Sequence, residues 1–225
     1  MLELTEVEGR MPYASNATLL AFSADGRRWV YKPEQGESPL WDFPWRSLAA
    51  REVLTYEVAT ALGLDIVPET VLADGPQGRG SAQAFIDEDF EFDPRTLFKP
   101  RPSPRLWPVA VLDVICNNAD RKLGHIIRQV GEDRLWAIDN GLTFHSDPKL
   151  RTVLWGFAGD EIPGPLLMAL ERLRAEDAPG VVGRVADLLS TEEAEAFRER
   201  VENLAHLRVH PLPPEDRPAL PWPVF

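Results

Sequence analysis

The most constraining feature of this chain is an apolar segment that ends abruptly in polar side chains. The stretch "VLDVICNNADRKLGH", residues 111–125, begins as a nearly continuous apolar run and ends with Asp120 and His125 among its polar groups. A second apolar run, "LWAID", delivers Asp139 into an Asn-Gly turn. Polar side chains at the end of a buried segment lie where a rigid scaffold can present them to a ligand. The two fragments therefore direct two carboxylates toward one place.

The first ninety residues predict a β-rich region that contains one helix. Two short apolar runs surround an Asp-Gly pair, which is a strong β-hairpin signal. A later segment carries apolar side chains at helical spacing and stops at Gly63. The predicted order is hairpin, helix, hairpin, with strands at 17–22, 28–32, 66–73 and 80–87 and the helix at 46–62.

A proline-rich segment separates this region from the remainder. Residues 91–108 contain five prolines and little periodicity, which is typical of a linker. We expect one domain, 1–225, divided into an N-terminal lobe (1–90), this linker (91–108) and a C-terminal lobe (109–225). The C-terminal lobe is predicted to hold helices at 106–117, 165–174 and 191–207 and short strands at 125–130 and 134–138.

Composition excludes several classes of function. The net charge is −12 and no basic cluster is present, which argues against nucleic acid and against an anionic membrane surface. The N-terminal "MLELTEVEGR" does not resemble a signal peptide, and no run approaches the ~20 apolar residues of a membrane span. A single cysteine fits a reducing compartment. We therefore expect a cytoplasmic protein with no nucleic-acid partner and no stable membrane anchoring.

The spacing of the polar residues is typical of kinase-type phosphotransferases. In those enzymes a catalytic aspartate is followed five positions later by a metal-binding side chain, and a second metal-binding aspartate precedes a glycine on the next hairpin. Here His125 follows Asp120 by five positions, and Asp139 follows Asp120 by nineteen. Lys32, one of only four lysines, lies on a hairpin strand from which it is placed to reach phosphates.

Four stretches, "VYKPEQGESP", "REVLTYEVATALGLDIVPETVL", "VLDVICNNADRK" and "AIDNGLTFH", resemble the type II phosphatidylinositol 4-kinases and, more distantly, the HipA-type serine/threonine kinases. The resemblance to this PI3/PI4-kinase-like family covers roughly residues 14–155. It implies an α+β, two-lobed protein-kinase-like fold, with an N-terminal antiparallel sheet and one helix, a compact and mainly helical C-terminal lobe, and ATP in the cleft. The implied activity transfers the γ-phosphoryl group of ATP to a hydroxyl of a protein or small molecule. A lipid acceptor is less favoured because the chain is acidic and has no cysteine cluster for acylation.

The resemblance also implies roles for individual residues. Lys32 would contact the phosphates, with Glu52 as its partner on the helix. Asp120 would accept the proton of the acceptor hydroxyl, and Asp139 would hold Mg²⁺ or Mn²⁺. Helical periodicity instead puts Glu57 nearer the apolar face; we favour Glu52 on the pattern of the resemblance and keep Glu57 as the alternative.

Main-chain groups complete the implied nucleotide site. Amides near Ser15 and Asn16 would cover the phosphates, although no G-x-G-x-x-G motif is present. Main-chain groups around Phe85 would contact the adenine.

His125 departs from the pattern, because related kinases have asparagine at that position. Imidazole suits first-row ions such as Mn²⁺ better than Mg²⁺. We weigh two roles for His125, a metal ligand and a hydrogen-bonding side chain. The departure also leaves open a nucleotide-binding pseudokinase or regulatory module without transfer activity, and AMP transfer.

Overall fold

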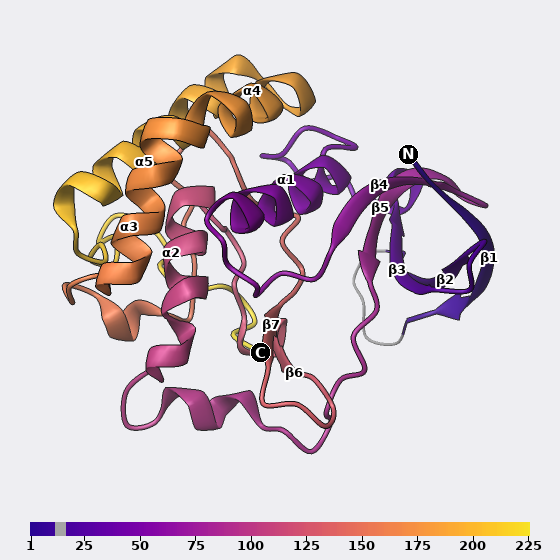
Figure 1. Ribbon diagram of the computed structural model, residues 1–225, viewed down its shortest axis with the longest axis horizontal. Helices are drawn as coiled ribbons and strands as arrows, with labels where there is room; N and C mark the ends of the chain where they lie inside the picture. The colour runs from indigo at the N-terminus through magenta and orange to yellow at the C-terminus, as the bar shows by residue number, and fades with distance from the viewer. Residues whose placement is uncertain (12–16) are drawn as a thin grey trace.

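The chain folds into a small β-barrel and a mainly helical region that pack against opposite sides of one helix (Figure 1). The structure is a computed structural model that describes residues 1–11 and 17–225, and the side chains of residues 176–179 are not described. The barrel strands are β1 (Leu2–Arg10), β2 (Leu19–Ser23), β3 (Arg28–Pro33), β4 (Thr70–Gly75) and β5 (Gly78–Ala84).

The barrel differs from the antiparallel sheet that the sequence predicts. Its strand order is β1-β2-β3-β5-β4, and a parallel pairing of β1 with β4 closes it at Leu2 with Ala73 and Glu3 with Asp74. Strand β1 is not predicted from the sequence, and its pairing with β4 joins residues from opposite ends of the region. Patterns within one segment cannot reveal such a long-range parallel contact.

Alternation along the strands separates two faces of the barrel. Its interior is filled by seven buried side chains: Leu4, Leu19, Ala21, Trp29, Tyr31, Ala73 and Ala82. Because successive strand residues point to opposite faces, Val30 and Lys32 on β3 face outward. This outer face carries the candidate site.

Helix α1 (Leu48–Ala61) lies between the barrel and the helical region (Figure 1). Every residue from Ala49 to Thr55 is buried, including Arg51 and Glu52. The helix therefore has no single apolar face, and its charged residues are enclosed with its alanines. This enclosure places Glu52 in the interior next to β3.

The helical region contains four helices and a short hairpin. These elements are α2 (Trp107–Cys116), β6 (Ile126–Arg128), β7 (Leu135–Ala137), α3 (Gly164–Arg172), α4 (Ala178–Leu188) and α5 (Thr191–Leu207). Helix α5 begins where the sequence predicts, because the Ser190 hydroxyl accepts a hydrogen bond from the Glu193 amide at 3.1 Å. Helix α4 is not predicted, since "APGVVGRVADL" contains one proline and two glycines.

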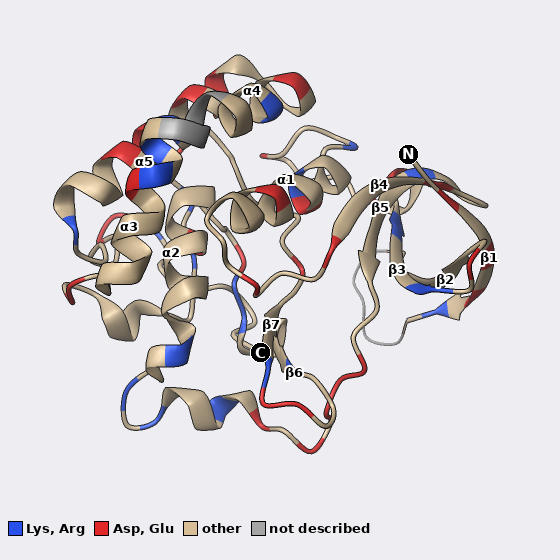
Figure 2. Cartoon of the chain, in the orientation of Figure 1, with Lys and Arg blue, Asp and Glu red and all other residues tan. Residues whose placement is uncertain are grey.

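The segment expected as a linker is partly ordered into 3₁₀ turns at Pro94–Phe98 and Pro104–Leu106. Further short turns lie at Glu34–Gly36, Leu123–His125 and Trp155–Phe157, and a π-helical turn spans Leu173–Asp177. None of the helices in the described residues is long and apolar enough to cross a bilayer. Lysine and arginine are scattered over the barrel and the helical region alike (Figure 2).

Candidate active site

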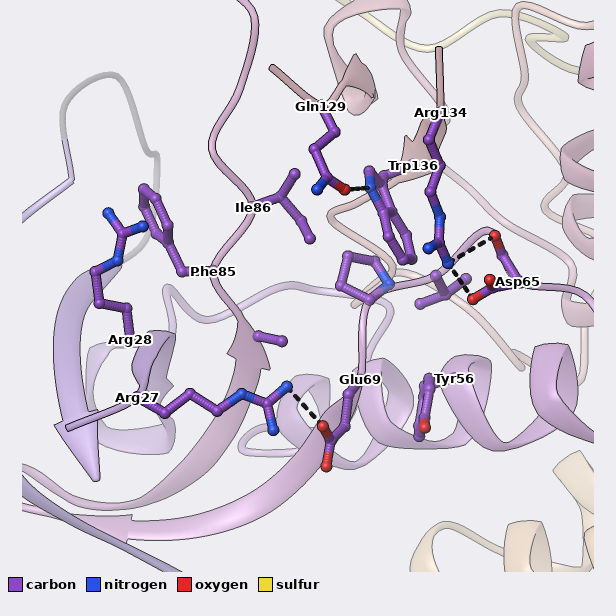
Figure 3. Close-up of a pocket in the computed structure, with 13 residues that line it drawn as sticks. Arg27, Arg28, Tyr56, Asp65, Glu69, Phe85, Ile86, Gln129, Arg134 and Trp136 are labelled. Carbon is purple, nitrogen blue, oxygen red and sulfur yellow. Dashed lines mark hydrogen bonds and ion pairs between the residues drawn. The ribbon is translucent and has the colours of Figure 1, made fainter. Parts of the chain in front are cut away.

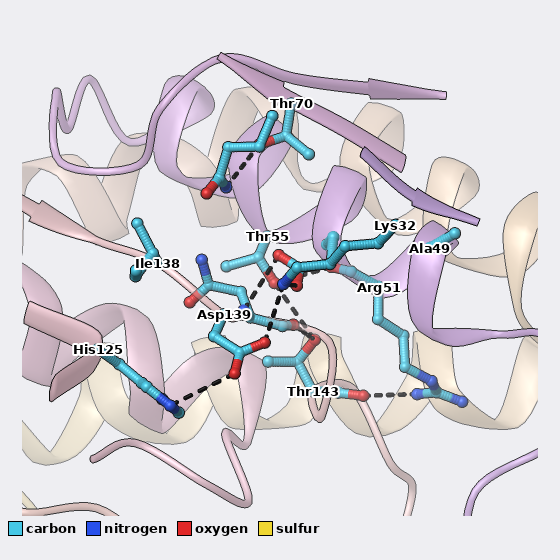
Figure 4. Close-up of polar contacts among 12 residues, drawn as sticks. Lys32, Ala49, Arg51, Thr55, Thr70, His125, Ile138, Asp139 and Thr143 are labelled. Carbon is cyan, nitrogen blue, oxygen red and sulfur yellow. Dashed lines mark hydrogen bonds and ion pairs between the residues drawn. The ribbon is translucent and has the colours of Figure 1, made fainter. Parts of the chain in front are cut away.

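Three charged side chains from separate parts of the chain meet beneath the barrel (Figure 4). The Lys32 ammonium on β3 donates to Glu52 on α1 and, at 2.9 Å, to Oδ1 of Asp139 in the loop after β7. The Glu52 side chain is almost fully buried, whereas 53% of the Asp139 side chain is exposed. The lysine is therefore anchored at one carboxylate and faces a second one that is open to solvent.

The loop that carries Asp139 is held in a strained shape. Asp139 has φ of +57°, a left-handed conformation that few residues other than glycine adopt. The amide of Asn140 donates to the second oxygen of Glu52 at 3.1 Å. Glu52 therefore binds both Lys32 and the loop, and it fixes the distance between them.

The charges of this group stabilise one another. Burial disfavours the Lys32 ammonium, but the carboxylates of Asp139 and Glu52 outweigh that effect and raise the pKa of Lys32. The Lys32 ammonium in turn lowers the pKa of Asp139. At neutral pH the site therefore holds the Lys32 ammonium beside the ionised carboxylate of Asp139.

The structure resolves the choice between the two glutamates of α1. Glu52 contacts Lys32, whereas Glu57 pairs with Arg184 at 2.9 Å. Helical periodicity favours Glu57 only if α1 has one apolar face, and this helix is buried on most sides.

His125 lies on the other side of Asp139 (Figure 4). Its Nε2 is 3.3 Å from Oδ2 of Asp139, and its Nδ1 accepts a long hydrogen bond of 3.5 Å from the Lys122 amide. Burial lowers the pKa of His125 to about 4, so the imidazole is neutral at neutral pH. Because Nδ1 accepts, the hydrogen of the neutral imidazole lies on Nε2, which faces the Asp139 carboxylate as a donor.

Asp120 lies in the loop between α2 and the β6–β7 hairpin. Its Oδ2 is 2.9 Å from the ammonium of Lys122, and its amide donates to Asn118 Oδ1 at 2.9 Å. Burial raises the pKa of Asp120, while its hydrogen bond with Lys122 opposes that shift. The role of Lys122 is not evident in the sequence, where it is one more polar residue in the cluster.

A second, fully buried group lies beneath this loop. The Arg121 guanidinium donates to both oxygens of Asp113 at 3.0 and 3.1 Å and to the Ile138 carbonyl at 2.8 Å. Asn118 and Thr152 also donate to Asp113. Since Ile138 immediately precedes Asp139, this network ties the Asp120 loop to the Asp139 loop.

The remaining predicted site residues lie elsewhere. Ser15 and Asn16 fall outside the described residues. Phe85 follows β5, and its amide donates to the Arg28 carbonyl at 3.1 Å. The Arg28 guanidinium lies 4.4 Å from the centre of the Phe85 ring. The Phe85 amide is thus already engaged, although its segment runs beside the site.

Phe85 also lines a cavity of about 520 Å³ that is separate from the charged group (Figure 3). Ion pairs flank this cavity, Arg27 with Glu69 and Arg134 with Asp65. Neither Lys32 nor Asp139 belongs to its lining. The cavity therefore lies outside the site that the charged residues define.

In the described part of the chain, no cluster of three or more His, Cys, Asp or Glu side chains could hold a metal ion by itself. His125 and Asp139 are neighbouring side chains with donor atoms of kinds that bind divalent cations. Mg²⁺ usually takes one or two protein carboxylates together with substrate phosphates, and the imidazole of His125 departs from that set of ligands.

Comparison with solved structures identifies the fold. The chain is similar to the proinflammatory kinase CtkA of Helicobacter pylori, with a TM-score of 0.58 and 13% identity over 91% of this chain and 92% of that one. It is similar to the Golgi casein kinase, with a TM-score of 0.61 and 12% identity over 92% and 71% of the two chains. A second structure of the Golgi casein kinase has Mn/ADP bound.

Hydra Fam20 gives a TM-score of 0.57 at 11% identity, over 92% of this chain and 84% of that one. At these identities the likeness shows a mixed α/β, kinase-like fold. These neighbours do not confirm the resemblance to phosphatidylinositol 4-kinases.

Comparison of sequences identifies a full-length relative. No protein-family model matches the chain. Protein Rv2133c of Mycobacterium tuberculosis is 38% identical over an alignment of 260 positions, which covers 99% of this chain and 92% of that protein. The chain therefore belongs to the same family as Protein Rv2133c.

Proposed function

We propose that this protein is an ATP-dependent phosphotransferase that moves the γ-phosphoryl group to a hydroxyl of a protein or small molecule. The observation that carries the proposal is the placement of the Lys32 ammonium between a buried Glu52 and an open Asp139. Kinases use a strand lysine held by a helix glutamate, together with a metal-binding aspartate, to position ATP. The kinase-like fold of the structural neighbours supports the same conclusion.

In this proposal Lys32 binds phosphate oxygens of ATP. Its raised pKa keeps the ammonium charged, and Glu52 keeps it pointed at the site. The left-handed backbone at Asp139 directs its carboxylate toward the same space. A positioned cation and a positioned carboxylate are what phosphoryl transfer requires of the protein, because the chemistry depends mainly on placement and charge.

Asp120 is proposed to receive the proton of the acceptor. The acceptor oxygen forms a bond to the γ-phosphorus, the bond from that phosphorus to the β,γ-bridging oxygen breaks, and ADP leaves with the electron pair. The hydroxyl proton passes to a carboxylate oxygen of Asp120. Lys122, 2.9 Å from Asp120, supplies positive charge beside the oxygens of the transferred group.

Asp139 and His125 are proposed to hold a divalent cation, Mg²⁺ or Mn²⁺. Their facing atoms are 3.3 Å apart, close to the ~3 Å that separates neighbouring ligand atoms around a Mg²⁺-sized ion. The imidazole is neutral, as a ligand must be, and ligation through Nε2 requires its proton to lie on Nδ1, at the cost of the long hydrogen bond from the Lys122 amide. When bound, the ion neutralises phosphate charge. The Mn/ADP bound to the Golgi casein kinase supports the use of a nucleotide and a divalent ion in this fold.

The segment around Phe85 is proposed to contact the base, and residues near Ser15 and Asn16 to cover the phosphates. Because the Phe85 amide already donates to the Arg28 carbonyl, the main-chain hydrogen bond to the base is assigned to the next residue, Ile86. The main-chain N–H of Ile86 donates to no other group in the described residues.

A nucleotide-binding module without transfer activity is the second candidate. His125 favours this candidate, because the histidine replaces a neutral oxygen ligand and directs a nitrogen to the carboxylate of Asp139. This candidate predicts binding of ATP without consumption. AMP transfer is a third outcome, which differs in the part of ATP that is retained.

Parallel reactions with γ-labelled and α-labelled ATP separate these candidates. The protein is incubated with Mg²⁺ or Mn²⁺, first alone for autophosphorylation and then with protein and small-molecule hydroxyl acceptors. We expect transfer of the γ-label, abolished by Asp139→Asn and Lys32→Met. The matched control is Lys99→Met, which removes an exposed lysine far from the site in sequence.

Each other result has a defined meaning. Transfer of the α-label would show AMP transfer, and nucleotide-induced thermal stabilisation without transfer would show the binding module. The absence of nucleotide binding with either ion would contradict all three candidates.

A further inference from the structure

Gln83 lies on the face of the barrel that carries Lys32. Strands β3 and β5 pair Val30 with Gln83 and Lys32 with Ser81, so these four residues share one face. The residues between them, Tyr31 and Ala82, fill the barrel interior. Two residues of strand span about 7 Å. The Val30–Gln83 pair is therefore the next pair on this face after Lys32–Ser81, two residues along the strands toward the segment that holds Phe85.

The orientation of the Gln83 amide is fixed by its neighbour on β4. The Thr70 hydroxyl donates its only hydrogen to the Pro68 carbonyl at 2.8 Å. Toward Gln83, at 3.0 Å, this hydroxyl can only accept, so the atom facing it is the NH₂ group. Thr70 and Gln83 are both buried, with 1% and 6% exposure, which holds the pair in place.

The carbonyl oxygen of Gln83 consequently points away from β4 and has no donor in the described residues. Buried polar atoms normally have a partner. Within the same described set, the fully enclosed side-chain atoms that lack one are Arg200 Nη2 and His210 Nε2. The Gln83 oxygen is not among them, so it keeps contact with solvent. Figure 4 shows Thr70 on the same side of the site as Lys32, above Asp139.

We propose that the Gln83 side-chain oxygen accepts a hydrogen bond from the exocyclic amino group of adenine and so selects ATP over GTP. This inference rests on the nucleotide site of the proposed function. Adenine carries an amino donor at C6, where guanine carries a carbonyl acceptor. A carbonyl oxygen held in one orientation attracts the amino group of adenine and repels the carbonyl group of guanine. Sites built around one substrate hydrogen bond reject analogues that cannot make it.

Thr70 acts in this proposal as a positioning residue. If its hydroxyl is removed, the Gln83 amide is free to turn and to present its NH₂ group to the guanine carbonyl. Thr70→Val should therefore relax base selection while Gln83 itself is unchanged. A merely structural role for Thr70 would lower affinity for both nucleotides equally.

The test measures equilibrium dissociation constants for ATP, GTP and purine riboside triphosphate, which lacks the amino group, with Mn²⁺ present. We expect the wild-type protein to bind ATP at least about tenfold more tightly than the other two. Gln83→Met should bring the three constants within about twofold, and Thr70→Val should strengthen GTP binding. Gln77→Met, which removes an exposed glutamine in the β4–β5 turn, is the matched control and should keep the wild-type ratio.

The outcomes distinguish this inference from the proposed function. Equal binding of ATP and GTP by the wild type, or an unchanged ratio in Gln83→Met, would overturn the role of Gln83 and leave the nucleotide site intact. Failure of the wild type to bind any of the three nucleotides would overturn both. If Gln83→Met does not fold, the Thr70→Val ratio and the wild-type comparison decide.

Discussion

Two pairs of charged side chains meet at the Asp139 loop, and they differ in how completely they are buried. In the Asp113 and Arg121 pair, the side chains are 1% and 0% exposed. In the Lys32 and Asp139 pair, the side chains are 23% and 53% exposed. The first pair sits among donors and acceptors that satisfy it, whereas Asp139 faces solvent with one oxygen toward His125.

The difference in burial indicates that the first pair stabilises the fold and that the second is accessible to a ligand. A buried ion pair that loses one partner leaves an uncompensated charge in the interior, which costs several kcal/mol. An exposed pair contributes little to stability, because water screens it. Arg121 therefore holds the loops in place, while Lys32 and Asp139 stay accessible, as the proposed nucleotide site requires.

The largest expected effect is on activity, from Asp139→Asn. The substitution keeps the left-handed backbone accessible, since asparagine tolerates it, but it removes the negative charge. We expect phosphotransfer to fall by about a thousandfold. The free energy of unfolding should change by less than about 1 kcal/mol, because the side chain is half exposed. Steady-state rates and urea unfolding measure the two quantities, and a loss of stability as large as that of a core substitution would contradict the comparison.

The next effect is on stability, from Arg121→Met. Asp113 would then be charged, buried and unpaired, so the free energy of unfolding should fall by about 3 to 5 kcal/mol in urea unfolding. Adding Asp113→Asn removes the uncompensated charge and should restore part of the lost free energy of unfolding. Arg217→Met, at an exposed ion pair, serves as the control and should change stability by less than about 0.5 kcal/mol.

A smaller effect is expected at the buried arginine of α1. Arg51 donates to Glu193 of α5 at 2.7 Å and to the Thr143 carbonyl in the loop after Asp139. Glu193→Gln keeps the shape but removes the charge, and it should cost about 2 kcal/mol in unfolding free energy. Glu202→Gln, on the same helix in an exposed pair with Arg198, should have almost no effect. Equal losses in the two variants would show that enclosure does not set the strength of these pairs.

The smallest effect is expected from Lys122→Met. Its ammonium neighbours Asp120 in a partly exposed pair, so stability should change by less than about 1 kcal/mol. Loss of the positive charge beside the transferred group should lower the rate about tenfold, or ~1.4 kcal/mol in the barrier. Lys99→Met is the control, and its rate should equal that of the wild type. A wild-type rate in Lys122→Met would show that Lys122 does not belong to the site.

Local spacing in the sequence singled out Lys32, Asp120 and Asp139, and the structure brings Lys32 and Asp139 into contact, while their roles stay predictions. Lys32, Asp120 and Asp139 each follow or end a short apolar run, and their order along the chain matches a known arrangement of catalytic parts. The helices at α2 and α5 were also predicted closely, since apolar side chains at helical spacing specify them. These features depend on neighbours in sequence.

The buried arginines of the enclosed pairs could not be predicted in the same way. Arg51 and Arg121 read as ordinary surface residues, because their burial depends on partners 142 and 8 positions away. The closing contact of β1 with β4 has no local signature. The contact of Lys32 with Glu52 was favoured only on the pattern of the resemblance, because helical periodicity pointed to Glu57. Gln83 was likewise missed, since its orientation depends on Thr70 across a strand.

Closure of the barrel is confined to the start of β1. In the part of the chain that the structure describes, β1 pairs with β4 only at Leu2 with Ala73 and Glu3 with Asp74, so the rest of this edge of β1 carries no strand pairing. An extended polypeptide that adds by main-chain pairing would therefore find an edge along β1 rather than at the β6–β7 hairpin, where the Asp89 amide donates to the Arg128 carbonyl and the Ala137 amide donates to the Ile66 carbonyl.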